Sequence, residues 1–481
     1  MSFRKLACSL GIVSVVGAGA AVVADEPSGA EWRAAGEAAS APQEGFALGD
    51  LSRLAHLEAM SGNGGAEDDI ATITAGYDKK DGFFIGDRNK EHFLLKFGAQ
   101  LQIRYTYKGR DQRGDTFNTA PPGPASLAEV GSRDSSSLEI ERVRLKFSGH
   151  ILNPDLTYTI QLDGDTDAGS TVRAIDAYVL YHAGEYFGGE NKAFSIGAGQ
   201  WKTAFLRQEP TSSSALQMVE RSLANEFFNI DRNLGLWVQG DLGMLFYSLS
   251  VVNAFDSVGV GPAAIDQVPA FVGRLVLNLV GDESPSKYEE SNIKCEEKPF
   301  FSIGGSFATD QNNGTSFTAA QQDFKCYTFG LDTAFKFSVF SMQAEYMGRW
   351  LDYEAGNTAA EGETSALYAH GFYVQAGVFL WPQVIELAGR VSAIWTDSGP
   401  FQGNAVEAGP GLNWYISKSH KVKLQTDVMF YDISADLPNQ TESLEVTGAG
   451  ATSSSPFSSS AANFAEGEQG IMWRTQLQIA F

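Results

Sequence analysis

The amino-acid sequence predicts an all-β fold, a transmembrane antiparallel β-barrel of about sixteen strands with an inward-folded third loop. Alternation of apolar and polar residues recurs over long stretches from Phe93 to the end of the chain. Short and long connections alternate between these stretches, as they do in such barrels. After an apolar N-terminal leader, no stretch reaches the roughly eighteen apolar residues of a membrane-spanning helix, which leaves a closed barrel as the way to cross a lipid bilayer.

Composition agrees with this fold class. The chain has 481 residues, 51 of them glycine, with 12% aromatic residues and three cysteines. This mixture is typical of many strands joined by turns. The formal net charge of -23 argues against nucleic-acid binding, which needs clustered lysine and arginine.

Residues 1–24 are predicted to be a signal peptide. Arg4 and Lys5 precede an apolar run of small residues, and cleavage is expected after Ala24. A membrane-anchor helix is the alternative, although the run is rich in glycine and alanine and short for a span. Residues 25–91 are acidic and weakly periodic, which predicts a largely disordered periplasmic segment with one helical candidate at 51–60. A contact with peptidoglycan or another periplasmic component is the alternative role for this segment.

Residues 92–481 are predicted to form the barrel. In the first strand, Leu95, Phe97 and Ala99 lie on one face, and Lys96 and Gln100 lie on the other. The predicted strands are 93–107, 137–149, 156–163, 173–182, 193–202, 232–241, 244–254, 270–280, 299–309, 325–337, 339–351, 367–380, 383–397, 403–417, 420–433 and 469–481. Sixteen is an even number, as single-chain bacterial barrels require.

The connections fix which end of the barrel is which. Tight turns are expected at 241–243, 337–339, 381–382 and 418–419, and long outer loops near 108–136, 203–231, 255–269, 310–324, 352–366 and 434–468. One connection does not fit. Residues 281–298 occupy the place of a short turn but are long and rich in lysine and glutamate, and the sequence suggests only a local insertion.

The last predicted strand closes the barrel. Trp473, Leu477 and Ile479 alternate with polar residues, and the chain ends on Phe481. Outer-membrane barrels commonly end on an aromatic closing strand. Further aromatic residues near strand ends suit the girdles at the two membrane interfaces.

Alternation also predicts the lining of the lumen. The apolar face must meet lipid, because a charge there costs roughly 2–4 kcal/mol at mid-membrane. The bases then predicted to face inward are Lys96, Arg104, Arg142, Arg144, Lys146, Arg274, Lys336, Arg349, Arg390, Lys421, Lys423 and Arg474. The inward acids are fewer: Asp163, Asp176, Asp332, Glu345, Glu386 and Asp427. A basic lumen is therefore expected; the alternative is a lumen in which these bases and acids pair and neutralise one another.

Residues 203–231 are too long for a turn and partly too apolar for a free surface loop. Folded inward, they would narrow the pore and offer hydroxyls and bases to passing solutes. The residues expected to do so are Lys202, Arg207, Ser212, Ser213, Ser214 and Arg221. An ordinary outer loop is the alternative.

The runs at 141–149, 158–163, 175–179, 199–205, 212–214 and 219–222 together resemble the phosphate-selective porin O and P family. The resemblance implies a sixteen-stranded, usually trimeric porin with basic lumen residues and an inward third loop that binds anions. The matching positions are Arg142, Arg144, Lys146, Lys202, Ser212, Ser213, Ser214 and Arg221. The sequence departs from the family in one respect, because the loop has few lysines and Glu209 and Glu220 lie among its bases.

The predicted function is an outer-membrane porin for passive diffusion of small hydrophilic solutes, with a preference for phosphate or similar anions. The alternatives are a non-selective or carbohydrate-passing porin and a structural outer-membrane protein. The expected pore-lining and anion-binding residues are Arg104, Arg142, Arg144, Lys146, Lys202, Arg207, Ser212, Ser213, Ser214, Arg221, Arg274, Arg390, Lys421 and Lys423. The expected partners are outer-membrane lipids, small anions such as phosphate, and further copies of the chain in a homotrimer.

No motif predicts a catalytic, cofactor or metal site, and an enzyme is not expected. Cys295 and Cys326 remain after the expected cleavage, and their places at opposite ends of neighbouring strands predict that they do not pair.

Overall fold

The computed structural model describes residues 73–78, 82–112, 134–164, 172–255, 268–283, 287–312, 324–353, 366–398, 401–433 and 468–481. The expected signal peptide, the helical candidate at 51–60 and most of the long outer loops lie outside the described residues. Within them, no helix is long and apolar enough to span a membrane.

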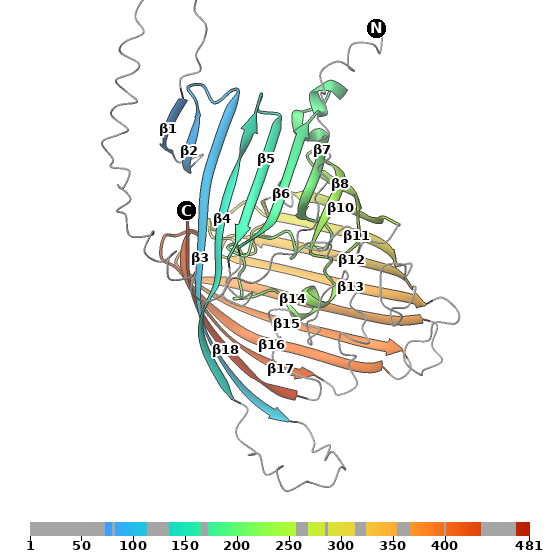
Figure 1. Ribbon diagram of the computed structural model, residues 1–481. Helices are drawn as coiled ribbons and strands as arrows, with labels where there is room; N and C mark the ends of the chain where they lie inside the picture. Colours follow the sequence, from blue (N-terminus) through green and yellow to red (C-terminus); the bar gives the residue numbers. More distant parts are fainter. Residues whose placement is uncertain are drawn as a thin grey trace, which may run out of the picture. The chain divides into compact units, whose positions relative to one another are not determined.

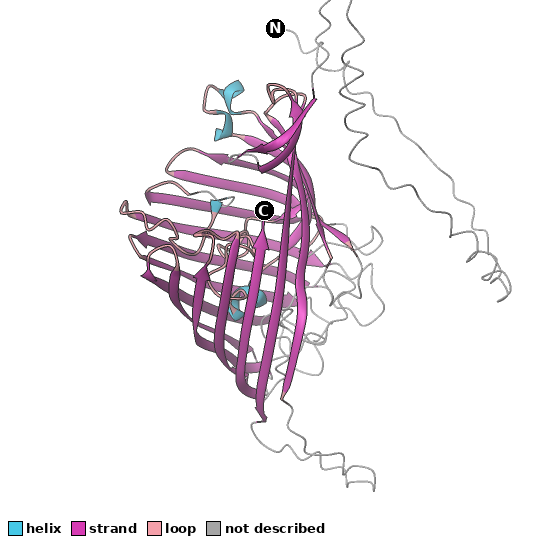
Figure 2. Ribbon diagram, turned by 90° about the vertical axis from the view of Figure 1, so that its left-hand side faces the viewer, coloured by secondary structure: helices cyan, strands magenta, loops and turns pink. Residues whose placement is uncertain are grey.

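Sixteen strands form a closed antiparallel barrel (Figures 1 and 2). They are β3 (Phe93–Gln112), β4 (Ser135–Ile151), β5 (Leu156–Asp163), β6 (Arg173–His182), β7 (Ser195–Lys202), β8 (Arg232–Asp241), β9 (Leu245–Val252), β10 (Ala270–Val280), β11 (Phe300–Asn312), β12 (Phe324–Phe337), β13 (Phe340–Tyr353), β14 (Ala366–Trp381), β15 (Ile385–Ser398), β16 (Phe401–Tyr415), β17 (Val422–Ile433) and β18 (Glu468–Ala480). Each strand pairs with the next, and β18 pairs with β3 to close the ring. The predicted barrel and its strand count are confirmed.

Helix is confined, in the described part of the chain, to three short elements. Two 3₁₀ turns, η3 (Gly184–Phe187) and η4 (Asn191–Ala193), lie in the connection between β6 and β7. The short α-helix α3 (Leu223–Phe228) lies in the connection between β7 and β8.

Two further strands precede the barrel, where the sequence predicted no strand. β1 (Ile73–Asp78) and β2 (Gly82–Asp87) form a hairpin, and β2 pairs with the first residues of β3. β2 lies beside β3 just beyond the end of β18. The terminal Phe481 pairs through its backbone with Ala99, and its ring lies 5.9 Å from Phe83 and 6.3 Å from Phe97. The hairpin therefore lengthens the wall at the seam. Its strands of six residues are too short for alternation to reveal.

The two faces of the wall follow the expected alternation. In β10, Phe271 and Leu275 are exposed on the outer face, whereas Val272 and Arg274 are buried inside. Charged and polar side chains are thus kept away from the lipid, as the cost of a charge at mid-membrane requires. The cysteines Cys295 and Cys326 are both free.

Candidate pore and its constriction

The third loop, residues 203–231, lies inside the barrel. In Figure 1 this green segment runs within the ring of strands between its exit from β7 and its return to β8. Lys423 of β17 donates from Nζ to the Leu216 carbonyl at 2.8 Å, and Arg144 of β4 donates to the Ser213 hydroxyl at 2.9 Å. The loop therefore reaches walls far around the ring, and the inward-folded loop is confirmed.

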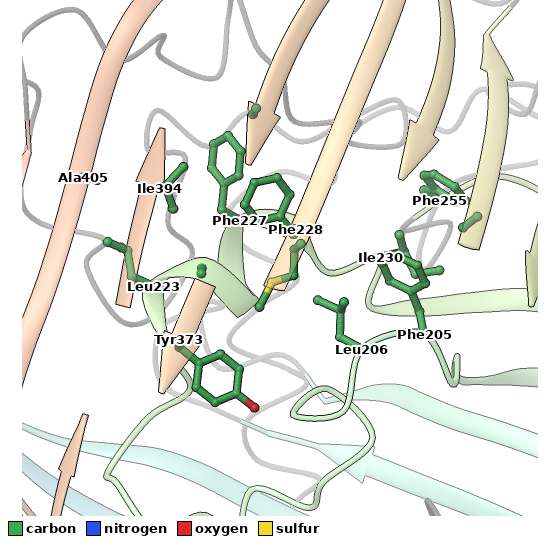
Figure 3. Close-up of a cluster of buried hydrophobic side chains, with 14 of the residues drawn as sticks. Phe205, Leu206, Leu223, Phe227, Phe228, Ile230, Phe255, Tyr373, Ile394 and Ala405 are labelled. Atoms are coloured by element: carbon green, nitrogen blue, oxygen red, sulfur yellow. The ribbon is translucent and has the colours of Figure 1, made fainter. Parts of the chain in front are cut away.

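An apolar anchor holds the loop against one side of the barrel. Ser222 caps α3 by accepting a hydrogen bond from the Asn225 amide at 3.1 Å. Phe227 and Phe228 of the helix pack in one buried cluster with inner-wall residues such as Tyr373 (Figure 3). The members of this cluster that come from β13 to β17 are Met347, Leu351, Ala369, Tyr373, Ala388, Ile394, Ala405, Met429, Tyr431 and Ile433. The assumption that apolar residues point only to lipid is wrong here, because the loop gives the inner wall a second apolar environment.

Glu220 connects the loop to the opposite wall. Its carboxylate is paired with Arg104 of β3 and lies 2.8 Å from Nη1 of Arg142 of β4. Glu141 joins this cluster, with its carboxylate 3.0 Å from Arg104 and 3.4 Å from Arg142. The register between β3 and β4 shifts between Gln102 and Ile103, and the extra residue turns Glu141 inward. Without this bulge Glu141 would share the outward parity of Val143, which is exposed.

Most other lumen bases are also buried against acids. Arg274 pairs with Asp332 at 2.8 Å, and Arg474 pairs with Asp427 at 2.8 Å. Further pairs of this kind are Arg390 with Glu407, Arg207 with Glu283 and Arg221 with Glu209. Arg274 also donates to the Phe205 carbonyl at 2.8 Å and Arg390 donates to the Glu220 carbonyl at 2.6 Å, so these compensated bases hold the third loop in place.

Part of the lumen is open among the residues that the structure describes. A cavity of about 480 Å³ lies between the third loop and the walls from β4 to β9. Six bases line it: Arg144, Lys146, Lys192, Lys202, Arg232 and Lys287. Among its lining residues only Asp176 and Asp241 are acids. We call this space the basic cavity.

The acids that pair with the bases of the basic cavity mostly lie behind them. The Arg144 side chain is 14% exposed and its partner Asp163 is 3% exposed. Lys202 is 16% exposed and its partner Glu209 is 3% exposed. Lys146 and Lys192 are exposed and have no ion-pair partner among the residues described. Arg232 differs, since it and its partner Asp176 at 2.9 Å are about equally exposed.

The structure thus divides the residues predicted from the sequence. Those that line the basic cavity are Arg144, Lys146, Lys202, Ser212 and Ser213. Those that face inward but are buried against the loop or within it are Arg104, Arg142, Arg207, Arg221, Arg274, Arg390 and Lys423. Ser214 is half-buried, and its carbonyl accepts a hydrogen bond from Gln478 at 3.0 Å. Lys421 precedes β17 and is exposed in the turn, so its predicted place on an inward strand face is wrong.

Three bases of the basic cavity escaped sequence reasoning. Arg232 is the first residue of β8 and has the same parity as the exposed Leu234 and Leu236, so alternation would place it on the outer face. Lys192 belongs to η4 and Lys287 to the connection between β10 and β11, and neither is in a strand. Only the high lysine content of 281–298 hinted at one of them.

A family model and one solved structure agree with this architecture. The family model described as phosphate-selective porin O and P matches residues 128–429. An anion-selective porin from Comamonas acidovorans is 11% identical, with a TM-score of 0.51 over 80% of this chain and 99% of that chain. A loop L8 deletion mutant of OmpT from Vibrio cholerae is 6% identical, with a TM-score of 0.47 over 80% of this chain and 98% of that one. Among curated proteins none matches the chain.

Proposed function

The chain belongs to the phosphate-selective porin O and P family of outer-membrane porins, and from this premise we propose that it passes small anions by diffusion through the basic cavity. Its location is the bacterial outer membrane. The family and the fold are those of channels, and the proposed role includes no catalytic step.

One observation carries the preference for anions. Solutes in the basic cavity would meet the exposed side of Lys146, Lys192 and Lys202, while Asp163 and Glu209 lie behind the side chains they neutralise. A cleft with walls of low dielectric focuses the field of the charges at its surface. Which charges face the solute therefore matters more than the net charge of the protein. Phosphate is the anion that the family suggests.

The test is the reversal potential of the purified full-length protein in a planar bilayer under a KCl gradient. We expect a reversal potential on the anion side and a current that phosphate reduces. Replacing both Lys146 and Lys192 by glutamine should move the reversal potential toward zero. Lys418→Gln is the matched control, because Lys418 is exposed in the turn between β16 and β17, away from the basic cavity. A parent channel with a cation-side reversal potential, or a double variant identical to the parent, would contradict the proposal.

A second candidate is a porin without strong ion selectivity. It is favoured by the many compensated lumen charges, such as the pair of Arg274 and Asp332. A reversal potential of zero, with no reduction of current by phosphate, would decide for this candidate.

The chain is also proposed to assemble as a homotrimer. The strands β5, β7 and β9 have eight residues each. At about 3.3 Å per residue and a tilt of about 40°, such a strand rises only about 20 Å, less than the apolar band of about 25 Å that lipid requires. Another copy of the chain would cover this low wall better than lipid. The mass of the complex in detergent, measured by light scattering, tests the trimer, and a monomer would contradict it.

A further inference from the structure

The long connection between β10 and β11, which the sequence left unexplained, folds into the barrel. We call it the inner turn; it is described at 281–283 and 287–299. Tyr288, Glu290, Ser291 and Ile293 are buried, although the segment is rich in charge. It lies at the end of the barrel with the short turns, opposite to the end from which the third loop enters.

The inner turn meets the third loop directly. The Glu290 carboxylate accepts hydrogen bonds from the Gln208 side chain at 2.8 Å and from the Gln217 amide at 2.7 Å. Glu283 pairs with Arg207 of the loop at 2.7 Å, and the Arg207 guanidinium lies 4.2 Å from the centre of the Tyr288 ring.

The inner turn also meets the wall. Glu290 accepts hydrogen bonds from Gln343 of β13 and Gln375 of β14, both at 2.8 Å. The Ser291 hydroxyl lies 2.9 Å from Glu386 of β15 and 2.7 Å from the Tyr415 hydroxyl of β16. These contacts occupy the lumen along the side of the barrel that lies opposite β5 and β6 in the strand order.

Glu290 joins the three parts. Each of its carboxylate oxygens accepts two hydrogen bonds, one from the loop and one from the wall. In the described part of the chain no base is paired with it, so neutral donors alone satisfy this buried carboxylate. A buried carboxylate that loses such donors is costly, so the bonds hold loop, turn and wall in one arrangement.

We propose that the inner turn is a second constriction element, which locks the third loop and closes the lumen on the side of β13 to β16, so that solutes pass only through the basic cavity. The inference goes beyond the proposed function in two respects. The inner turn limits the size of the pore, and it blocks a path that would avoid the bases of the basic cavity. It rests on the proposed function only for the effect on selectivity.

The test compares single-channel conductance of the full-length protein with two variants. In the first, residues 289–297 are replaced by a short glycine–serine linker, which keeps Lys287 and Tyr288 of the basic cavity; in the second, Glu290→Gln replaces one acceptor oxygen by an amide group that donates. We expect at least a two-fold rise of conductance in the first variant and a smaller rise in the second. Glu289→Ala is the matched control, since its side chain is exposed beside Glu290. Only preparations whose migration on a gel changes on heating are compared, because this change shows that the barrel is folded.

Unchanged conductance in both folded variants would overturn the proposal. The conductance readout does not depend on ion preference, so a parent with zero reversal potential would defeat the proposed function and leave this inference standing. Where the parent prefers anions, the linker variant should also show a reversal potential nearer zero, because its new path avoids Lys146 and Lys202.

Discussion

The buried carboxylate of Glu220 links the third loop to Arg104 and Arg142 of the wall. Replacing Glu220 by glutamine keeps the size of the side chain but removes the charge that Arg104 and Arg142 share. The Glu220 side chain is fully buried, so solvent cannot replace the lost charge. We expect the variant to fold into a less stable barrel with a more loosely held third loop.

The size of the effect follows from the geometry. Breaking a buried ion pair by removing one partner costs about 3–5 kcal/mol. Glu141 remains 3.0 Å from Arg104 and 3.4 Å from Arg142, and it compensates part of their charge. The expected loss therefore lies near the lower limit, at about 3 kcal/mol.

The assay is equilibrium unfolding in urea, with the protein in lipid vesicles and tryptophan fluorescence as the signal. A double variant, Glu220→Gln with Arg142→Gln, leaves Arg104 and Glu141 as a balanced pair. The double variant should lose less stability than the sum of the losses measured for the two single variants. A Glu220→Gln barrel within about 0.5 kcal/mol of the parent would refute the reasoning, since that is the scale of surface substitutions.

Three further predictions concern the same interior. Phe228→Ala should lower the free energy of unfolding by about 3–5 kcal/mol, because the ring is buried in the apolar anchor; unfolding in urea measures it, and a surface-like effect would contradict it. Gly197→Val should displace the Trp237 ring, which lies 2.1 Å from an added Cβ, at a cost of about 1–3 kcal/mol and with a changed tryptophan emission. Burial raises the pKa of Glu283, but Lys336 and Arg207 outweigh it, so the pKa lies below its ordinary value. The stability that ionised Glu283 contributes is present above its ordinary pKa and is lost as the pH falls through the lowered pKa. Single-channel conductance should rise in that pH range, and the Glu283→Gln variant should not show this rise.

The strands could be predicted because lipid enforces a simple rule. Every outward position must be apolar, and nine of the strands have thirteen or more residues over which the rule repeats, as β12 does. The hairpin β1–β2 lacks this length. It depends instead on pairing with the edge of β3, which local sequence does not reveal.

The lumen could be predicted only in part. Alternation placed Arg104 and Arg142 inside, but their partner Glu220 is 116 residues from Arg104 along the chain. Pairings over such distances depend on how the third loop folds, and nothing in the periodicity of a strand encodes them. The same holds for Glu290, whose partners come from the loop and from two strands.

The central claim is that solutes pass through the basic cavity, and Ser212 allows the most direct test because it is exposed there. The measurement is the single-channel conductance of Ser212→Cys, in a background with Cys295→Ser and Cys326→Ala, before and after reaction with a bulky methanethiosulfonate reagent. We predict that complete modification, verified by mass spectrometry, reduces conductance to less than half and that phosphate slows the reaction. Full conductance after complete modification would show that the current takes another path, which would contradict the account.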